Sequence, residues 1–383
     1  GFMFVLLAFV FFLVVQFYFY AFVFGKYTGT ASSPFLLPKS LKDPPTRSVD
    51  HVPGGVSVVV CAFNEADNLL SNLKSLAEQR YPDYEIILVD DGSTDETPRI
   101  IQEFQDEFNS EKRPVRVLRI PPSESNGKKY ALSRGIEMAR RENILVTDAD
   151  CSPSSPHWIN KMASGLEGDS EIVLGYGAYL KIPGSLLNKL IRYETLMTAL
   201  QYFSYALQGQ AYMGVGRNLA YKKVLFEEAG GFKTHLDVRS GDDDLFVNEV
   251  ATSKNTVICD HPDAFTISDP EGELSSWVRQ KRRHITTSKH YKTKQKFKLG
   301  VFYLSQIGFY TGAIALLTVN TGPRLVIGLI LFRFLVFYYT INRTAKKLHE
   351  KDLVTLAPLY EISIIFMQLY LFVANTFSPP KKW

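Results

Sequence analysis

Residues 56–91 read VSVVVCAFNEADNLLSNLKSLAEQRYPDYEIILVDD, and this stretch determines the fold class. It begins with a continuous apolar run at 56–61 and ends with a second such run at 85–90. Runs of this kind, rich in β-branched residues, are typical of strands buried in a parallel sheet. Between them, residues 66–79 repeat apolar side chains at helical spacing. The stretch therefore predicts a strand–helix–strand unit whose two strands are parallel.

The same alternation continues along the chain. We expect further strands at 115–120 (VRVLRI) and 143–148 (NILVTD), with helices near 95–108 and 127–141. Strands that alternate with helices predict an α/β domain with a mostly parallel sheet. In sheets of this type, ligands bind at the carboxyl ends of the strands.

Polar side chains gather at those strand ends. Asn64 and Glu65 follow the first strand, and residues 90–93 (DDGS) follow the second. Asp148 and Asp150 lie at the carboxyl end of the fourth strand. Two carboxylates separated by one residue can hold one hard divalent cation, whose shell is completed by phosphate oxygens. An Asp-rich turn that binds no metal is the alternative for this pair.

Residues 90–93 also fit an ordinary helix entry. Ser93 or Thr94 would cap the following helix, Gly92 would form the turn, and the acidic residues after them favour a helix N-terminus. The position directly after a buried strand favours ligand binding instead.

Two charged clusters lie further along the chain. Residues 241–244 read GDDD, and acidic residues of this kind are common in the first turn of a helix. Three adjacent carboxylates also repel one another, which raises at least one pKa and suits a general base. Residues 280–284 (QKRRH) place three cations together. They form either an exposed basic helix at a membrane surface or a site that neutralises a diphosphate.

Four long apolar segments are separate from this domain. Residues 2–24 form the first, in which Gln16 is the one amide or charged side chain. Three further spans are expected near 299–319, 323–342 and 356–377. About 20 apolar residues cross a hydrocarbon core of about 30 Å. The first segment lacks the positive start and the cleavage site of a signal peptide. Glu361 and Gln368 leave a re-entrant or interfacial helix as the alternative for the last segment.

Basic residues orient these spans. Lysines and arginines follow the first span, precede the second within 289–298, and fill the loop at 343–355. The positive-inside rule then places 25–298 and 343–355 in the cytoplasm and both termini outside. The Lys-rich run at 289–298 is either a solvated face or, as its position favours, a contact with anionic headgroups. We expect an integral protein of a bacterial inner membrane with a cytoplasmic α/β domain.

The composition excludes several classes of protein. With 383 residues of which 46% are hydrophobic, the chain is not disordered. Three cysteines, Cys61, Cys151 and Cys259, exclude a disulfide scaffold and lack metal or redox spacing, so we expect reduced thiols. A formal net charge of +4 is too small for a dedicated nucleic-acid binder, and we expect no nucleic-acid partner.

Seven motifs occur in order along the chain. They are AFNE (62–65), DDGSTDET (90–97), GKKYAL (127–132), DAD (148–150), GVGRNLAYKK with GGF (214–232), GDDD (241–244) and QKRRH (280–284). Together they resemble the membrane-bound, inverting family 2 glycosyltransferases, over about 54–290. The resemblance implies the GT-A fold, a Rossmann-like mixed and mostly parallel sheet, and a requirement for Mg²⁺ or Mn²⁺. One N-terminal and about three C-terminal transmembrane helices match the way such enzymes are anchored.

The resemblance also implies a role for individual residues. Binding of a nucleotide-sugar donor, with UDP favoured over GDP, is implied for Glu65, Asp90, Asp91, Lys128, Asp148, Gln280 and Arg283. Asp148 and Asp150 would coordinate the metal, and Arg283 would bind the diphosphate. Asp243 would act as the general base, with Asp242 as the alternative because three aspartates are adjacent.

One position departs from the family pattern. The family's Gln-x-x-Arg-Trp element ends in a Trp that helps to form the acceptor site, and His284 takes that position here. The missing Trp and the small number of spans disfavour a synthase that elongates and secretes a polysaccharide, which stays the first alternative. We expect a membrane lipid or lipid-linked acceptor. A non-catalytic nucleotide-sugar or lipid-binding membrane protein is the second alternative, and the complete acidic set disfavours it.

These observations define a domain organisation. We expect a transmembrane helix at 1–25, a linker at 26–53, a cytoplasmic catalytic domain at 54–290, and a basic segment with three transmembrane helices at 291–383. Residues 184–209 form either a pair of core helices or an amphipathic helix in the membrane interface that brings the acceptor to the base. The sequence does not identify the transferred sugar.

Overall fold

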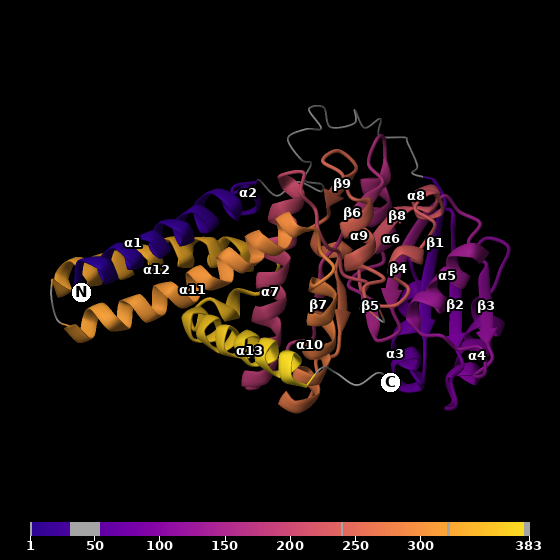
Figure 1. Cartoon of the computed structure of the whole chain (residues 1–383). Helices are drawn as coiled ribbons and strands as arrows, with labels where there is room; N and C mark the ends of the chain where they lie inside the picture. The colour runs from indigo at the N-terminus through magenta and orange to yellow at the C-terminus, as the bar shows by residue number, and fades with distance from the viewer. Residues whose placement is uncertain (1, 31–53, 239, 320–321, 379–383) are drawn as a thin grey trace. The chain divides into compact units, whose positions relative to one another are not determined.

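The computed structural model describes residues 2–30, 54–238, 240–319 and 322–378 (Figure 1). The chain divides into two compact units. The helical unit comprises residues 1–31, 183–204 and 272–383, and the α/β unit comprises residues 32–182 and 205–271. The expected linker at 26–53 lies largely outside the described residues. The domain limits expected from the sequence stay a prediction, because a compact unit is defined by contacts and not by chemistry.

The main sheet of the α/β unit has seven strands in the order β3-β2-β1-β4-β8-β6-β9. The strands are β1 Val56–Ala62, β2 Tyr84–Asp91, β3 Val115–Ile120, β4 Asn143–Asp148, β6 Ile172–Leu174, β8 Leu219–Lys222 and β9 Thr256–Ile258. β1 to β4 are parallel, and β8 runs antiparallel to both of its neighbours, β4 and β6. The expected mixed and mostly parallel sheet is confirmed.

A second, three-stranded sheet lies in the same unit. It consists of β5 Cys151–Pro153, β10 Thr266–Ser268 and β7 Gly177–Tyr179, with β10 in the middle. β10 is antiparallel to β5 and parallel to β7. Because β5 begins one residue after Asp150, this small sheet borders the expected metal site.

Helices cover both faces of the main sheet. They are α3 Ala66–Ala77, α4 Thr97–Phe108, α5 Lys128–Met138, α6 Trp158–Ala163, α8 Lys223–Glu228 and α9 Asp244–Val250, with short turns at Ser164–Leu166, Lys233–His235 and Pro262–Ala264. The three helices expected near 66–79, 95–108 and 127–141 are therefore confirmed to within about three residues. The apolar side chains of α3, α4 and α6 form one core with alternate residues of β1 and β2.

α5 packs against β1 and β2 at very short range, and a glycine allows it. A Cβ atom added at Gly135 would lie 2.7 Å from Val59 Cγ1 and 2.9 Å from Val89 Cγ2. Carbon atoms pack at about 3.5–4.0 Å, so a larger residue cannot fit without movement. This close approach brings the first residue of α5, Lys128, to the carboxyl ends of the strands.

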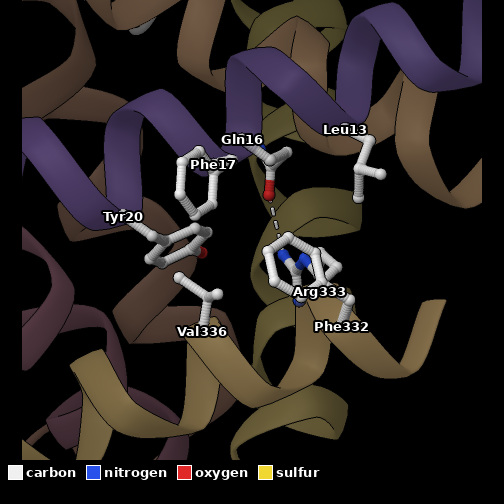
Figure 2. Close-up of a pocket in the computed structure, with 7 residues that line it drawn as sticks. All are labelled: Leu13, Gln16, Phe17, Tyr20, Phe332, Arg333 and Val336. Atoms are coloured by element: carbon white, nitrogen blue, oxygen red, sulfur yellow. Dashed lines mark hydrogen bonds between the residues drawn. The ribbon is translucent and has the colours of Figure 1, made fainter. Parts of the chain in front are cut away.

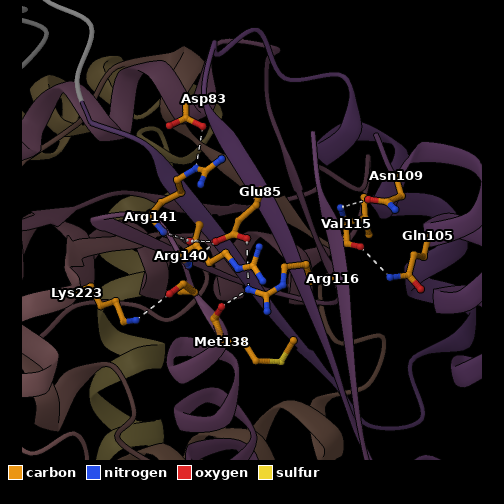
Figure 3. Close-up of polar contacts among 12 residues, drawn as sticks. Asp83, Glu85, Gln105, Asn109, Val115, Arg116, Met138, Arg140, Arg141 and Lys223 are labelled. Atoms are coloured by element: carbon orange, nitrogen blue, oxygen red, sulfur yellow. Dashed lines mark hydrogen bonds and ion pairs between the residues drawn. The ribbon is translucent and has the colours of Figure 1, made fainter. Parts of the chain in front are cut away.

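The opposite, amino-terminal end of these strands carries a buried carboxylate of its own (Figure 3). Glu85 Oε1 accepts hydrogen bonds from Ser57 Oγ at 2.7 Å and from the Arg140 N–H at 2.6 Å, and its Oε2 lies 3.6 Å from Arg116 Nη1. Arg141 forms an ion pair with Asp83 nearby, at 2.8 Å. These bonds satisfy Glu85, so its burial marks a structural anchor and not a reactive site.

The helical unit contains the candidate membrane spans. Its first helix, α1 Phe2–Phe17, continues through a π-turn at Tyr18–Val23 into α2 Gly25–Thr28. The other helices are the first part of α7 Leu186–Leu207, α10 Leu274–Ser288, α11 Thr293–Val319, α12 Pro323–Lys347 and α13 Ala357–Phe377, with a short turn at Lys351–Leu353. Among the described residues, four helices are long and apolar enough to cross a membrane: Met3–Thr28, α11, α12 and α13. One N-terminal and three C-terminal spans were expected, and this is confirmed.

Polar residues of these spans pair with one another (Figure 2). Arg333 Nη2 lies 2.5 Å from Glu361 Oε1 and donates to Gln16 Oε1 at 2.9 Å, and Gln16 Nε2 donates to Ser305 Oγ at 2.7 Å. The guanidinium also lies over the ring of Phe337, at 4.7 Å from its centroid. Glu361, one of the two polar residues behind the re-entrant alternative for the last span, thus has an ion-pair partner inside the helical unit.

The helix α7 is mostly buried. Arg192, 2% exposed, pairs with Glu350 at 3.0 Å and with Asp352 at 2.9 Å, and Glu194 pairs with Lys281 of α10 at 2.6 Å. Ion pairs of this kind hold α7 against other parts of the helical unit. Such burial is typical of a core helix, and the predicted interfacial location of 184–209 stays a prediction.

Candidate active site

The loops that follow β1 and β2 are tied together by hydrogen bonds. The Asn64 N–H donates to Ser93 Oγ at 2.9 Å, Asn64 Oδ1 accepts from the Thr94 N–H at 2.9 Å, and the Glu65 N–H donates to Thr97 Oγ1 at 2.8 Å. Asn64 has a φ of 54°, in the left-handed region that Asn tolerates better than most residues. The first two predicted clusters therefore form one surface at the carboxyl edge of the sheet.

Asp90 and Asp91 are both buried at this edge. Asp90 Oδ1 accepts from the Ser93 N–H at 3.0 Å, and Asp90 Oδ2 lies 3.5 Å from Arg119 Nε. Asp91 Oδ1 is buried without a hydrogen-bond partner among the described residues. Burial raises the pKa of Asp91, and the charge of Asp90 raises it further. A buried acceptor without a partner is available to a ligand donor such as a base N–H or a ribose hydroxyl.

Glu65 lies in the electrostatic field of the predicted metal ligands. Its carboxylate accepts a hydrogen bond from Asn68 Nδ2 at 2.5 Å. Burial raises the pKa of Glu65, and the nearby charges of Asp150 and Asp148 add to that shift. The structure thus brings the clusters after β1 and β4 close enough to interact, as their positions on adjacent parallel strands predict.

Lys128 joins the metal motif to the acidic cluster that precedes α9. Lys128 Nζ lies 2.7 Å from Asp148 Oδ1 and 2.9 Å from Asp242 Oδ2. Burial alone would lower the pKa of Lys128, but the carboxylates of Asp148, Asp242 and Asp243 raise it well above the usual range of lysine. The ammonium therefore stays charged and balances the acids around it.

Asp243 caps α9 and lies next to this lysine bridge. Its Oδ1 accepts from the Asp244 N–H at 2.7 Å, and its Oδ2 accepts from the Gly216 N–H at 2.6 Å. Burial and the charges of Asp242 and Asp244 raise the pKa of Asp243 to about 7. A carboxylate with a pKa near neutrality is suited to accept a proton at physiological pH.

Asp148, Asp150 and Cys151 form a group that could hold a metal ion. One ligand atom from each lies within 4.8 Å of the others. Burial raises the pKa of Asp150, and the charge of Asp148 raises it further, as expected for two neighbouring carboxylates. Carboxylate oxygens suit a hard cation such as Mg²⁺ or Mn²⁺, so the two aspartates fit the expected metal.

The last predicted cluster belongs to α10 of the helical unit. Lys281 pairs with Glu194, and Arg282 Nε donates to Asn375 Oδ1 at 2.9 Å, so these two cations hold helices together. Arg283 and His284 are exposed, and Gln280 is partly buried. The roles expected for Gln280, Arg283 and His284 in binding the diphosphate and the acceptor stay predictions.

Sequence reasoning assigned no role to several residues that shape the site. Lys129 is 4% exposed, and its Nζ donates to the backbone oxygens of His235 and Val238, both at 2.6 Å. It anchors the segment that leads to the three aspartates. The two adjacent lysines of GKKYAL indicated a charged site, but the sequence does not show which of the two side chains is buried. Asn218, fully buried, accepts from Trp158 Nε1 at 3.0 Å.

Comparisons with known proteins define the family. Residues 57–230 match the sequence profile described as Glycosyl transferase family 2. This chain carries a family 2 glycosyltransferase domain. The family expected from the seven motifs is thereby confirmed.

Individual relatives agree with this family. The domain is similar to the probable glycosyltransferase YdaM of Bacillus subtilis, at 27% identity over 281 residues that cover 68% of this chain and 64% of YdaM. A shorter match at 35% identity over 102 residues, 26% of this chain, covers 21% of the beta-monoglucosyldiacylglycerol synthase of Nostoc sp.. The chain therefore spans less than two thirds of the length of these curated relatives.

A solved structure confirms the fold. The mannosyltransferase PcManGT from Pyrobaculum calidifontis, in complex with GDP-Man and Mn²⁺, superimposes with a TM-score of 0.57 at 18% identity. The likeness covers 92% of this chain and 99% of that one. At this identity it shows the fold alone, and the fold is the GT-A fold that the motif set implies.

Proposed function

We propose that this protein is a metal-dependent, inverting glycosyltransferase that transfers a sugar from a nucleotide-sugar donor, with UDP favoured, to a membrane lipid or lipid-linked acceptor. One observation carries the proposal: Lys128 bridges Asp148 and Asp242, which brings the metal motif and the candidate base to one place. The structural neighbour was solved with GDP-Man and Mn²⁺, and one relative is named as the synthase of a glycosylated lipid.

Each candidate residue has a proposed role in binding the donor or the metal. Asp90, Asp91 and Glu65 bind the base and ribose of the donor, and Asp148 and Asp150 hold Mg²⁺ or Mn²⁺. The metal, when bound, supplies positive charge that stabilises the leaving diphosphate. Lys128 adds a fixed positive charge at the same place.

Asp243 removes the proton of the acceptor hydroxyl. The hydroxyl then attacks the anomeric carbon from the face opposite the nucleotide, so the configuration inverts. Asp242 is the less suitable base because its carboxylate is already paired with Lys128. Gln280 and Arg283 bind the diphosphate, and His284 contributes to the acceptor site.

The membrane spans keep the protein in the bilayer that contains the acceptor. The protein lies in a bacterial inner membrane with the α/β unit in the cytoplasm, where nucleotide-sugars are made. A lipid acceptor then reaches the site from the membrane surface without leaving the bilayer.

A nucleotide-release assay tests this function. Purified full-length protein is incubated with a panel of UDP- and GDP-sugars and Mg²⁺ or Mn²⁺, with and without a membrane lipid extract, and the lipids are analysed by mass spectrometry. We expect release that depends on metal and on lipid, with one sugar added per lipid. A ladder of polymer would instead establish the polysaccharide synthase, and the absence of release from the whole panel would contradict catalysis.

A further inference from the structure

A chain of hydrogen bonds runs from Arg217 to the predicted metal ligand Asp150. Arg217 Nη1 donates to Ser268 Oγ at 2.9 Å, Ser268 Oγ lies 3.3 Å from Cys151 Sγ, and Cys151 Sγ donates to Asp150 Oδ1 at 3.2 Å. Ser268 and Cys151 are each 1% exposed. All four residues belong to the α/β unit, and the first three have no place in the catalytic roles assigned above.

The register of the small sheet produces this arrangement. Ser268 of β10 lies directly opposite Cys151 of β5 and beside Tyr179 of β7. Directly opposed residues project from the same face of a sheet, so these side chains meet. Arg217 lies over the ring of Tyr179 at 4.2 Å and donates to the backbone oxygen of Gly177 at 2.8 Å. A slip of one residue would place Ile267 at this position and break the chain of bonds.

Only one direction of donation is consistent along the chain of bonds. Arg217 can only donate, so Ser268 Oγ accepts from it and keeps its own hydrogen for another acceptor. Cys151 has one hydrogen, which it donates to Asp150. Ser268 must therefore donate to Cys151 Sγ. Each donor polarises the next, and the positive end of the series lies at the guanidinium.

We infer that Arg217 is a positioning residue that acts through Ser268 and Cys151 to hold Asp150 in the orientation of a metal ligand. Cys151 occupies Oδ1 of Asp150 and so fixes the side-chain rotamer. The other oxygen is then available to a cation shared with Asp148. Residues that orient a metal ligand typically change metal affinity by about 10–100-fold when they are removed.

This inference rests on the proposed metal site, and it assigns Cys151 a role as a donor and not as a ligand. A thiol that coordinated the ion would have to lose the proton that it gives to Asp150. The two roles differ in what Ser268 does. A ligand thiol would not need Ser268, whereas the relay requires it.

Binding of Mn²⁺ alone to the full-length protein tests the relay, with free Mn²⁺ measured by electron paramagnetic resonance. We expect Ser268→Ala and Cys151→Ala each to weaken binding about tenfold. Cys151→Ser keeps a donor and should bind within about twofold of the wild type, by the same relation.

Thr266→Val is the matched control. Thr266 lies on the same strand, is fully buried, and donates to the Arg217 backbone oxygen at 2.9 Å, an oxygen that also accepts from Thr147. The substitution removes a comparable hydroxyl but leaves the side-chain bonds of Arg217, Ser268 and Cys151 in place. Its Mn²⁺ affinity should match that of the wild type, and its midpoint of thermal unfolding should match that of Ser268→Ala.

The outcomes separate the relay from the metal site. Equal weakening by Thr266→Val and Ser268→Ala would show a general structural role and overturn the relay. Weakening by Cys151→Ala without an effect of Ser268→Ala would make Cys151 a direct ligand and overturn it also. In both cases the wild type still binds Mn²⁺, and the proposed function survives. No binding of Mn²⁺ by the wild type would overturn the metal site and the relay together.

Discussion

Asp243 combines a structural role with the catalytic role proposed above. Both of its oxygens accept backbone N–H groups, from Asp244 and Gly216, and these bonds fix the carboxylate at the start of α9. Burial and the neighbouring acids nevertheless raise its pKa to about 7, whereas Lys128 and the Gly216 bond lower it. A cap alone explains the position of Asp243. The raised pKa beside the metal motif favours a base.

The pKa of Asp243 predicts the pH dependence of transfer. A base acts in its deprotonated form, so kcat/KM should fall as the pH decreases through about 7, the raised pKa of this carboxyl. The measurement is kcat/KM between pH 5 and 9 at saturating metal. A kcat/KM that stays constant down to about pH 5, as for a carboxyl with the ordinary Asp pKa of about 4, would contradict the assignment.

The sequence was sufficient to predict the first four strands of the α/β unit and the three helices between them, whereas β5 to β10 were not predicted. Continuous β-branched runs located β1 to β4, because strands buried on both faces have no polar side, and the acidic clusters were correctly expected at their carboxyl ends. Pairings between distant segments were not predictable. Ser268 meets Cys151 and Lys129 meets His235 across more than 100 residues, and no local pattern encodes those contacts. Cys151 in particular lacked any spacing motif.

The packing of α5 against the sheet predicts a stability effect. Gly135→Ala should lower the free energy of unfolding by about 1–3 kcal/mol, because the new Cβ would overlap Val59 and Val89. The measurement is the midpoint of thermal unfolding in detergent. Gly300→Ala is the control, since nothing lies within 4 Å of its added Cβ. An unchanged midpoint for Gly135→Ala would show that α5 can shift without cost.

Charge is distributed unevenly over the whole molecule. Lysines and arginines lie in the spans and in the segments that flank them, whereas aspartates and glutamates gather at the strand ends. The formal net charge of +4 is the small difference between these two groups. Inside the spans, Arg333 and Glu361 are each 2% exposed and pair with one another. The buried pair joins α12 to α13 and so holds the helical unit together.

Breaking this pair should be more harmful than replacing it. Glu361→Gln and Arg333→Met should each destabilise the protein by about 3–5 kcal/mol, because each leaves a buried charge without the opposite charge that balances it. The double variant should be more stable than either single variant. Thermal unfolding of all three proteins in detergent measures the coupling. Strictly additive losses would show that the two side chains act independently.

The proposed orientation makes a separate prediction. Lys294 and Arg324 are exposed near opposite ends of the hairpin of α11 and α12. In intact cells, a membrane-impermeant maleimide should label Arg324→Cys, whereas Lys294→Cys should react only after permeabilisation. The wild-type protein gives the background from its own three cysteines. The reverse pattern would place the α/β unit outside the cell and contradict the use of cytoplasmic donors.

The most direct measurement compares Asp243→Asn with the wild type in one preparation, with nucleotide binding and nucleotide release followed separately. The substitution keeps the shape of the side chain and removes the proton acceptor. We expect nucleotide affinity to stay within about twofold while lipid-dependent release falls by about 10²–10⁴-fold, the usual contribution of a general base. Undiminished release by Asp243→Asn would contradict the central claim that this carboxylate activates the acceptor.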